Sequence, residues 1–260
     1  MRKVLGWLVA QAYRFAGARR RAVARVKAKD LIVPVVIHSA TAGEVRAILA
    51  WCRKKGVLDN LWLSFDDGWN ELAETVAVLE EFGKPATVFV SPAETERGRS
   101  WTTDLPLEVR RRLYRLPAEE RYGEIAGFTE IENDANLLFP SEIRRLARHP
   151  LIRLGNHTWS HLSCTHRPVA EVLAEVDRAQ ATLTEWGGTA PTDFAYPFGR
   201  GTPELDAEIR KRGMTPHYTR QGFVTRETLG EARNMVREGF TLAENLGRIF
   251  MAWPRVGETL

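Results

Sequence analysis

The sequence predicts an α/β protein in which strands lead repeatedly into helices, a pattern that suits a barrel better than an open sheet. Two observations support this fold class. From Asp30 onward, short runs rich in β-branched and aromatic residues alternate with longer amphipathic stretches. In addition, polar clusters follow three of the apolar runs, and α/β folds place their functional residues at strand ends.

The composition is that of an ordinary globular chain. Its 260 residues are 44% hydrophobic and 27% charged, which excludes a disordered or fibrous protein. No apolar run approaches the roughly 18 residues that a membrane-spanning helix needs. Cys52 and Cys164 lie far apart in the sequence, so they predict neither a disulfide framework nor a cysteine-rich metal site.

The basic charge is concentrated in an N-terminal segment, residues 1–30. The segment holds nine Lys or Arg residues and one acid, a local charge of 9 − 1 = +8, whereas the whole chain carries 37 − 33 = +4. Apolar residues at helical spacing precede the arginines, so residues 2–29 form a basic amphipathic segment that could rest on an anionic membrane surface. A helix packed on the domain and a cleaved signal peptide are the alternatives.

The cellular location that we expect also follows from the N-terminal segment. Gln11 and Arg14 interrupt the apolar stretch, and three arginines follow the only plausible cleavage site, which makes an exported form the weaker reading. We therefore expect a cytoplasmic protein, peripheral at the inner face of the membrane. The rest of the chain carries a net charge of 4 − 8 = −4, so we expect no nucleic-acid partner.

Residues 31–260 are expected to form a single domain. Strands are predicted over 31–38, 60–65 and 86–91, and helices over 42–55 and 70–82. Charged helical pieces then predict an insertion at about 92–140, which shapes a substrate cleft or serves as scaffold. Beyond it, a helix begins at Pro140 with Ser141 as its N-cap and runs to Arg148. Later strands are predicted over 151–155, 193–197, 217–219 and 234–237, and later helices over 169–186 and 203–212.

The first polar cluster is Ser64–Trp69 (SFDDGW), at the end of a predicted strand. Adjacent carboxylates on a regular strand point to opposite faces. At a strand end, with Gly68 permitting a sharp turn, Asp66 and Asp67 can reach one site. A plain turn with a helix-capping carboxylate is the alternative.

The second cluster, Asn156–His161 (NHTWSH), also follows an apolar strand. Histidines four residues apart share a helix face, so His157 and His161 can reach one metal ion. Two imidazoles and one carboxylate leave positions open for water and substrate, as a hydrolytic metal site requires. Two surface or capping histidines are the alternative.

The third cluster, Phe194–Gly199 (FAYPFG), offers rings that could stack on a sugar or simply pack in the core.

In this order, the three clusters closely resemble the motifs of the polysaccharide deacetylase family (carbohydrate esterase family 4). Ser64–Gly68, His157–His161 and Phe194–Gly199 are similar to its first, second and third motifs. The resemblance spans about residues 31–240 and leaves the N-terminal segment uncovered. It implies a distorted (β/α) barrel that holds one divalent metal, usually zinc (Zn²⁺).

The resemblance also implies roles for individual residues. Asp67, His157 and His161 would be the metal ligands, and Asp66 the general base. A backbone N–H near Tyr196 and Pro197 would stabilise the oxyanion. Two tryptophans beside the motifs, Trp69 and Trp159, are candidate substrate contacts.

The general acid departs from the family's commonest pattern. No Leu-x-His motif occurs near the C-terminus, where residues 234–237 (NMVR) stand, and the third motif lacks the arginine often found there. The chain instead resembles a subgroup of exopolysaccharide N-deacetylases that carries a histidine at the end of the first strand. We therefore assign the general acid to His38, with His217 as the alternative.

The expected function is a metal-dependent hydrolase that removes N-acetyl groups from an amino sugar of a surface glycan or its lipid-linked precursor. An O-acetyl esterase or an N-deformylase would use the same site, because nothing in the motifs separates an ester from an amide. A catalytically silent glycan-binding module is the alternative of a different class. Such a module would have no chemical reason to keep both carboxylates and both histidines.

Overall fold

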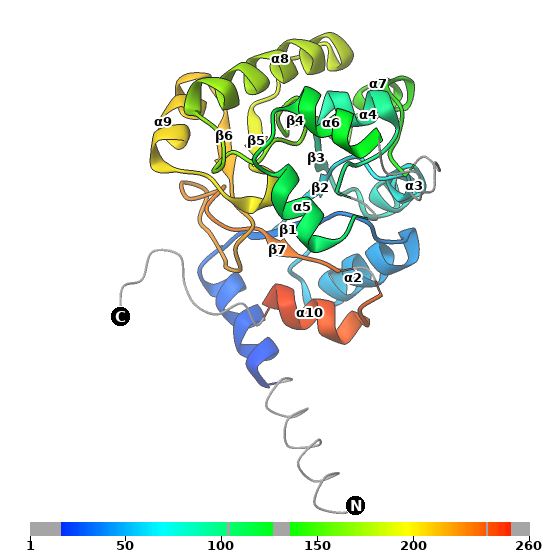
Figure 1. Cartoon of the computed structure of the whole chain (residues 1–260). Coiled ribbons are helices and arrows are strands. Elements are labelled where there is room, and N and C mark those ends of the chain that lie inside the picture. Colours follow the sequence, from blue (N-terminus) through cyan, green and yellow to red (C-terminus); the bar gives the residue numbers. More distant parts are fainter. Residues whose placement is uncertain (1–16, 103–104, 127–135, 238, 251–260) are drawn as a thin grey trace, which may run out of the picture.

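A curled parallel sheet forms the centre of the protein. The computed structural model describes residues 17–102, 105–126, 136–237 and 239–250. The strands are β1 (Val33–Ile37), β2 (Leu61–Asp66), β3 (Ala86–Val90), β4 (Ile152–Asn156), β5 (Asp193–Ala195), β6 (Thr215–His217) and β7 (Asn234–Met235). Their order in the sheet is β6-β5-β4-β3-β2-β1-β7, and all neighbouring strands pair in parallel. The sheet curls into a half-barrel with helices around it (Figure 1), which confirms the predicted distorted (β/α) barrel.

Aromatic contacts show how strongly the sheet curls. Trp62 on β2 and His217 on β6 stack with ring centroids 4.6 Å apart, although β3, β4 and β5 lie between their strands. The ring of Phe89 on β3 packs against His217 at 5.5 Å. Gly155 on β4 makes room for this ring, because a Cβ there would lie 2.4 Å from it. Aromatic rings therefore fill the inner face of the half-barrel.

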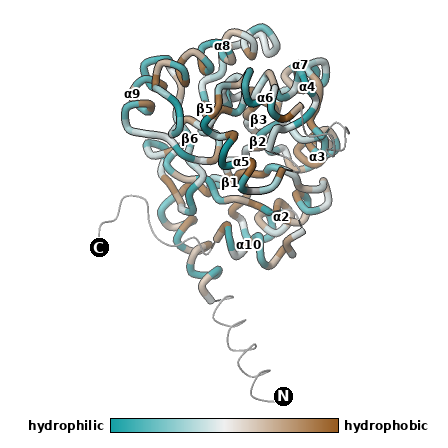
Figure 2. Tube along the Cα trace, viewed as in Figure 1, coloured by the Kyte–Doolittle hydropathy of each residue, from teal (hydrophilic) through white to brown (hydrophobic). Residues whose placement is uncertain are grey.

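Helices cover the sheet and connect its strands. They are α2 (Ala42–Lys55), α3 (Glu71–Phe82), α4 (Pro92–Arg97), α5 (Leu107–Leu113), α6 (Ala118–Ala126), α7 (Pro140–Ala147), α8 (Val169–Gly187), α9 (Pro203–Lys211) and α10 (Leu242–Phe250), with a short 3₁₀ turn, η1 (Pro197–Gly199). Helix α8 buries one face through Val172, Val176, Ala179, Leu183 and Trp186, a helical spacing of apolar residues. Hydrophilic and hydrophobic residues accordingly alternate along α8 and α9 (Figure 2).

Several predicted boundaries differ from the structure. Ser141 is not the cap of α7: Pro140 occupies the first turn, and the side chain of Glu142 accepts a hydrogen bond from the N–H of Phe139 at 3.0 Å. Strand β6 ends at His217, where the sequence predicted that it begins. Helix α4 is the first helix of the predicted insertion, whereas α10 falls in a stretch for which no helix was predicted.

The described part of the N-terminal segment packs on the domain. Residues 17–28 are helical, and Val26 is fully buried in the main core, with Ala22 and Val23 packed against that core. The apolar residues at positions 4–15, on which the membrane prediction rests, lie outside the described residues. In the part of the chain that the structure describes, no helix has the length and hydropathy needed to cross a membrane.

Candidate active site

The three sequence clusters meet around one cleft of about 740 Å³ at the carboxyl ends of the strands. The cleft contains residues from each cluster and from the insertion. Its lining includes His38, Asp66, Asp67, Thr102, Arg110, Tyr114, His157, His161, Thr165, Tyr196, Phe198, Gly199, Arg200, Gly201, Thr219, Arg220 and Met235. The position agrees with the rule that α/β folds build their sites at this edge of the sheet.

The chain turns sharply between the two adjacent aspartates. Asp66 ends β2 in extended backbone, whereas Asp67 has φ 71° and Gly68 has φ 81°. A non-glycine residue at positive φ is uncommon and is held by its surroundings. Here Trp69 Nε1 donates a hydrogen bond to Asp67 Oδ2 at 3.2 Å. The turn sends both carboxylates to one site and leaves Asp67 Oδ1 facing the histidines.

The two histidines lie on a loop, so the helix expected from their spacing is wrong. Residues 157–163 follow β4 without a helical turn, and Thr158 and His161 have φ values of 62° and 53°. Side chains hold this loop in place of helical hydrogen bonds. Asn156 Oδ1 accepts from the Thr158 N–H at 3.0 Å, and Thr158 Oγ1 accepts from the Leu162 N–H at 2.9 Å.

The insertion fastens the histidine loop from outside. Arg121 on α6 is fully buried and donates from Nη2 to the Ser160 carbonyl at 2.5 Å and to its hydroxyl at 2.8 Å. Trp101 Nε1 donates to the His161 carbonyl at 3.2 Å. On the other side, Glu175 of α8 accepts the Ser160 N–H at 2.7 Å. The insertion is therefore part of the site, since it supports this loop and supplies residues to the cleft.

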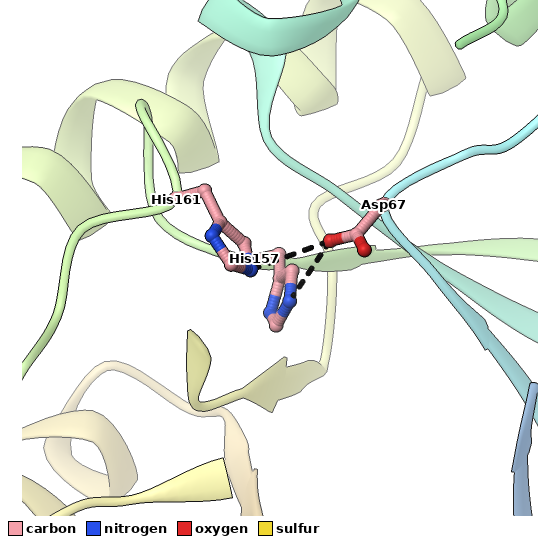
Figure 3. A group of neighbouring side chains, drawn as sticks. All are labelled: Asp67, His157 and His161. Atoms are coloured by element: carbon pink, nitrogen blue, oxygen red, sulfur yellow. Dashed lines mark ion pairs between the residues drawn. The ribbon is translucent and has the colours of Figure 1, made fainter. Parts of the chain in front are cut away.

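Asp67, His157 and His161 form a compact buried group whose ligand atoms all lie within 4.8 Å of one another (Figure 3). Asp67 Oδ1 is 3.5 Å from His157 Nε2 and 3.4 Å from His161 Nε2. Two ligands about 2.1 Å from a tetrahedral zinc ion would be about 3.4 Å apart. These separations exceed the usual 2.7–3.2 Å of a hydrogen bond. The group therefore fits a divalent metal such as zinc.

The donor set also suits metal binding. The Nδ1–H of His157 donates to the Ala195 carbonyl at 2.7 Å, which turns Nε2 toward Asp67. Burial lowers the pKa of His161 to about 3, so its imidazole is neutral at physiological pH. Burial opposes ionisation of Asp67, but His161 and His157 outweigh it and hold the pKa of the carboxyl far below its ordinary value. Burial opposes the charge of His157, but Asp67 and Asp66 outweigh it and raise the pKa of its imidazole, so a metal at this site would displace any proton there. Two imidazoles and one carboxylate are a common ligand set for a hydrolytic metal.

Asp66 forms a buried bidentate ion pair with Arg233, which sequence reasoning missed. Arg233 Nη1 and Nη2 donate to the two oxygens of Asp66 at 2.6 and 2.9 Å, and both side chains are almost entirely buried. Burial opposes ionisation of Asp66, but the charge of Arg233 outweighs it and lowers the carboxyl pKa. Asp66 is therefore a carboxylate. No motif marks Arg233, because it lies 167 positions away, just before β7.

The two candidate acids differ in access to the cleft. His38 lines the cleft with a side chain about one-third exposed, and its Nε2 lies 3.9 Å from Asp66 Oδ2. His217 is fully buried, stacks on Trp62 and is hydrogen-bonded through Nε2 to Asp193 at 2.7 Å. His38 alone of the two therefore meets the space where a substrate would lie.

Not all residues predicted to contact the substrate or the oxyanion are placed to do so. The N–H of Tyr196 already donates to the His217 carbonyl at 3.2 Å, and Pro197 has no N–H. Trp159 is packed in the main core beneath Arg178, outside the cleft lining. Trp69 holds Asp67, as described above. Phe198 does line the cleft, with its ring 4.7 Å from the His161 ring and 4.6 Å from the ring of Tyr114, a lining residue from the insertion.

A half-barrel with a buried Asp-His-His group beside a second carboxylate in an open cleft has the architecture of a metal-assisted hydrolase. A family model for polysaccharide deacetylases matches residues 54–217, more than half of the chain. The chain belongs to the polysaccharide deacetylase family. The metal-dependent chemistry of that family agrees with the ligand set found here.

Solved structures support the fold at low sequence identity. Polysaccharide deacetylase BC0361 from Bacillus cereus is 14% identical, covers 84% of this chain and 69% of its own, and has a TM-score of 0.59. IcaB from Ammonifex degensii is 18% identical, covers 78% and 91%, and has a TM-score of 0.55. The BpsB deacetylase domain from Bordetella bronchiseptica is 15% identical, covers 78% and 96%, and has a TM-score of 0.53. None of the curated proteins compared with the chain matches it.

Proposed function

We propose that this protein is a zinc-dependent hydrolase that removes an N-acetyl group from an amino sugar of a surface glycan or its lipid-linked precursor. The observation that carries the proposal is the arrangement of Asp67, His157 and His161 beside the buried carboxylate of Asp66 in one open cleft. A separate base next to a metal group is what amide hydrolysis requires.

Each residue has a distinct task in this proposal. A zinc ion held by Asp67, His157 and His161 would supply Lewis-acid polarisation and lower the pKa of water. Asp66 takes the proton of the attacking water, because its ionised oxygens retain lone pairs that Arg233 does not use. Arg233 fixes the plane of this carboxylate through two parallel hydrogen bonds.

Breaking the amide also requires an oxyanion donor and an acid. The oxyanion donor in this proposal is the backbone N–H of Phe198. Tyr196 and Gly199 already donate their N–H groups elsewhere, and Pro197 has none. His38 is the group that would protonate the departing amine, since it lines the cleft beside Asp66. Its partial exposure lets it exchange protons with solvent between turnovers.

Metal analysis is the first test. Protein stripped with chelator and reloaded with zinc should hold about one zinc per chain, and His157→Ala should lose it. Asp66→Asn should keep the zinc but lose turnover by roughly a thousandfold, because only the base is removed. Amine release would be followed over a panel of N-acetyl sugars, together with acetate release from O-acetyl sugars and formate release from N-formyl sugars.

The outcomes separate the alternatives. Release of acetate only from esters, or of formate only from formamides, would keep the site and change the bond. Wild-type protein that binds glycan but neither holds zinc nor turns over any substrate would be a silent binding module. Normal turnover by Asp66→Asn would show that the base is another group.

A further inference from the structure

Three arginines face the cleft without an ionic partner. Arg110 lies on α5 of the insertion, Arg200 follows η1, and Arg220 follows β6, so three separate elements bring them to one cavity. Among the described residues, no carboxylate lies within ion-pair distance of any of the three. Arg200 and Arg220 are exposed, and Arg110 is half-buried.

A local contact orients one of these side chains without neutralising it. The guanidinium of Arg220 lies over the Tyr218 ring at 4.5 Å, which leaves its N–H edge available for a ligand. Arg110 has a buried Nε without a hydrogen-bond partner.

The charges in the lining do not balance. Its two carboxylates are Asp66 and Asp67, and both are committed, one to Arg233 and the other to the two histidines. A divalent metal at Asp67 would add further positive charge. The rest of the cleft wall therefore presents an uncompensated positive field, which concentrates anions and repels cations.

A neutral N-acetyl sugar polymer has no group that would use this field. After deacetylation such a polymer carries ammonium groups, and the three arginines would repel them. Guanidinium groups pair in a bidentate manner with phosphate and carboxylate oxygens. The lining therefore favours an amino sugar with a negative charge on the same or a neighbouring residue.

We infer that the substrate is an anionic glycan, in which a phosphate ester or a uronate carboxylate near the N-acetyl group binds Arg110, Arg200 and Arg220. The inference rests on the proposed deacetylase function and narrows its substrate class. The amino sugar fits between these arginines and the metal group, with the acetyl group toward Asp66. Glycans that already carry free amines are poor substrates for this cleft.

Matched substrates test the inference. N-acetylglucosamine 1-phosphate and an oligosaccharide of alternating glucuronate and N-acetylglucosamine supply the two anions, di-N-acetylchitobiose is neutral, and a partly deacetylated chitin oligomer is cationic. We expect a kcat/KM at least roughly tenfold higher for one of the anionic substrates than for the neutral one, and the lowest value for the cation. The better anion identifies phosphate or carboxylate as the recognised group.

Variants show whether the arginines cause the preference. Arg110→Gln, Arg200→Gln and Arg220→Gln should each raise the KM for the preferred anion by roughly fivefold or more, with little change for the neutral sugar. Arg46→Gln is the matched control, because Arg46 is an exposed residue of α2 paired with Glu81 outside the cleft lining. Circular dichroism checks that each variant folds.

A binding measurement keeps the inference testable if none of these sugars is turned over. Calorimetry with methyl phosphate and with methyl glucuronide on zinc-loaded protein should show salt-sensitive binding that is lost in the triple arginine variant. Binding that survives in this variant would come from the metal alone and would overturn the inference. Equal kcat/KM for anionic and neutral sugars would also overturn it while leaving deacetylation intact. Absence of zinc and of all turnover would contradict the proposed function instead.

Discussion

At the scale of single residues, two neighbouring carboxylates have different chemistry because the chain turns between them. Asp67 at φ 71° aims at the two histidines, while Asp66 on the last position of β2 aims at Arg233. The proposed metal ligand and the proposed base therefore occupy consecutive positions without competing for one ion. Arg233 holds the Asp66 carboxyl ionised, whereas Asp67 is paired with the two histidines.

Arg233 should be required for both stability and turnover. Arg233→Met removes the partner of a buried carboxylate, which typically costs about 3–5 kcal/mol of the free energy of unfolding. Arg233→Lys keeps the charge but loses the two parallel hydrogen bonds, so its loss should be smaller. Urea unfolding of both variants measures this difference. Equal stability of Arg233→Met and wild type would show that the ion pair contributes nothing.

His38 should matter most where the leaving group needs a proton. His38→Ala should slow amide cleavage by roughly a hundredfold or more, and should slow an activated aryl acetate much less, since its leaving group departs without protonation. Steady-state kinetics on both substrates checks this, with His149→Ala as a control because His149 pairs with Glu80 away from the cleft. Equal losses on amide and ester would argue against His38 as the acid.

At the scale of elements, a buried acid holds parts of the insertion together through hydrogen bonds. Glu94 on α4 accepts hydrogen bonds from the Tyr122 hydroxyl and, at 2.6 Å, from the Trp101 N–H. Burial raises the pKa of Glu94 to about 7. The folded protein therefore holds this proton more tightly than the unfolded chain does, and stability falls as pH rises from about 4.5 to about 7.

Glu94→Gln should remove this pH dependence. Glutamine mimics the protonated acid: its oxygen can accept from Trp101, and its amide can donate to Tyr122. Between pH 5 and pH 8, wild type should lose about 2–4 kcal/mol of unfolding free energy relative to the variant. Urea unfolding of both proteins, each zinc-loaded, isolates the difference. Parallel pH profiles would show that Glu94 is ionised throughout.

The regular elements were predictable from local pattern, whereas the loops that hold the site were not. The β-branched run around Val33–Ile37 and the helix ending at Gly83 follow from residue type and capping. The spacing of His157 and His161 suggested a helix, but Asn156 and Thr158 bond the local backbone and hold a loop instead. Local side-chain bonds of this kind compete with helical ones.

Some residues of the site were likewise predictable from the sequence and others were not. The sequence predicted that Asp66, Asp67, His157 and His161 would share one site, because each lies in a contiguous motif. Arg233 and Arg121 could not be predicted, because each reaches the site through a contact far along the chain: Arg121 meets Ser160 across 39 positions. A buried arginine without a motif carries no local signal, and only tertiary packing reveals it.

At the scale of the whole molecule, a deletion that tests membrane binding by the N-terminal segment must not disturb the packing of the domain. Val26 is buried in the main core, so removal of residues 1–29 would damage the fold as well as any membrane contact. Deleting residues 2–16 instead retains Ala22, Val23 and Val26, the residues that pack on the core. It also leaves the basic residues from Arg19 to Lys29 in place.

The shorter deletion should weaken membrane association. Wild-type protein should co-sediment with vesicles rich in anionic lipid and less with neutral vesicles, because the segment combines apolar residues with positive charge. The deletion variant should stay mostly in the supernatant. Unchanged sedimentation would mean that residues 2–16 do not anchor the protein, and a packed or cleaved segment would then be favoured.

The pairing of Asp66 with Arg233 has a consequence for synthesis on the ribosome. The emerging chain contains the three proposed metal ligands once residue 161 has left the exit tunnel. The guanidinium beside the proposed base comes from a residue just before β7, 167 positions after Asp66. Until then Asp66 lacks the guanidinium that binds both of its carboxylate oxygens. If the proposed roles are correct, a prematurely terminated chain would contain all three metal ligands but lack the partner of its base, and we expect no hydrolysis from it.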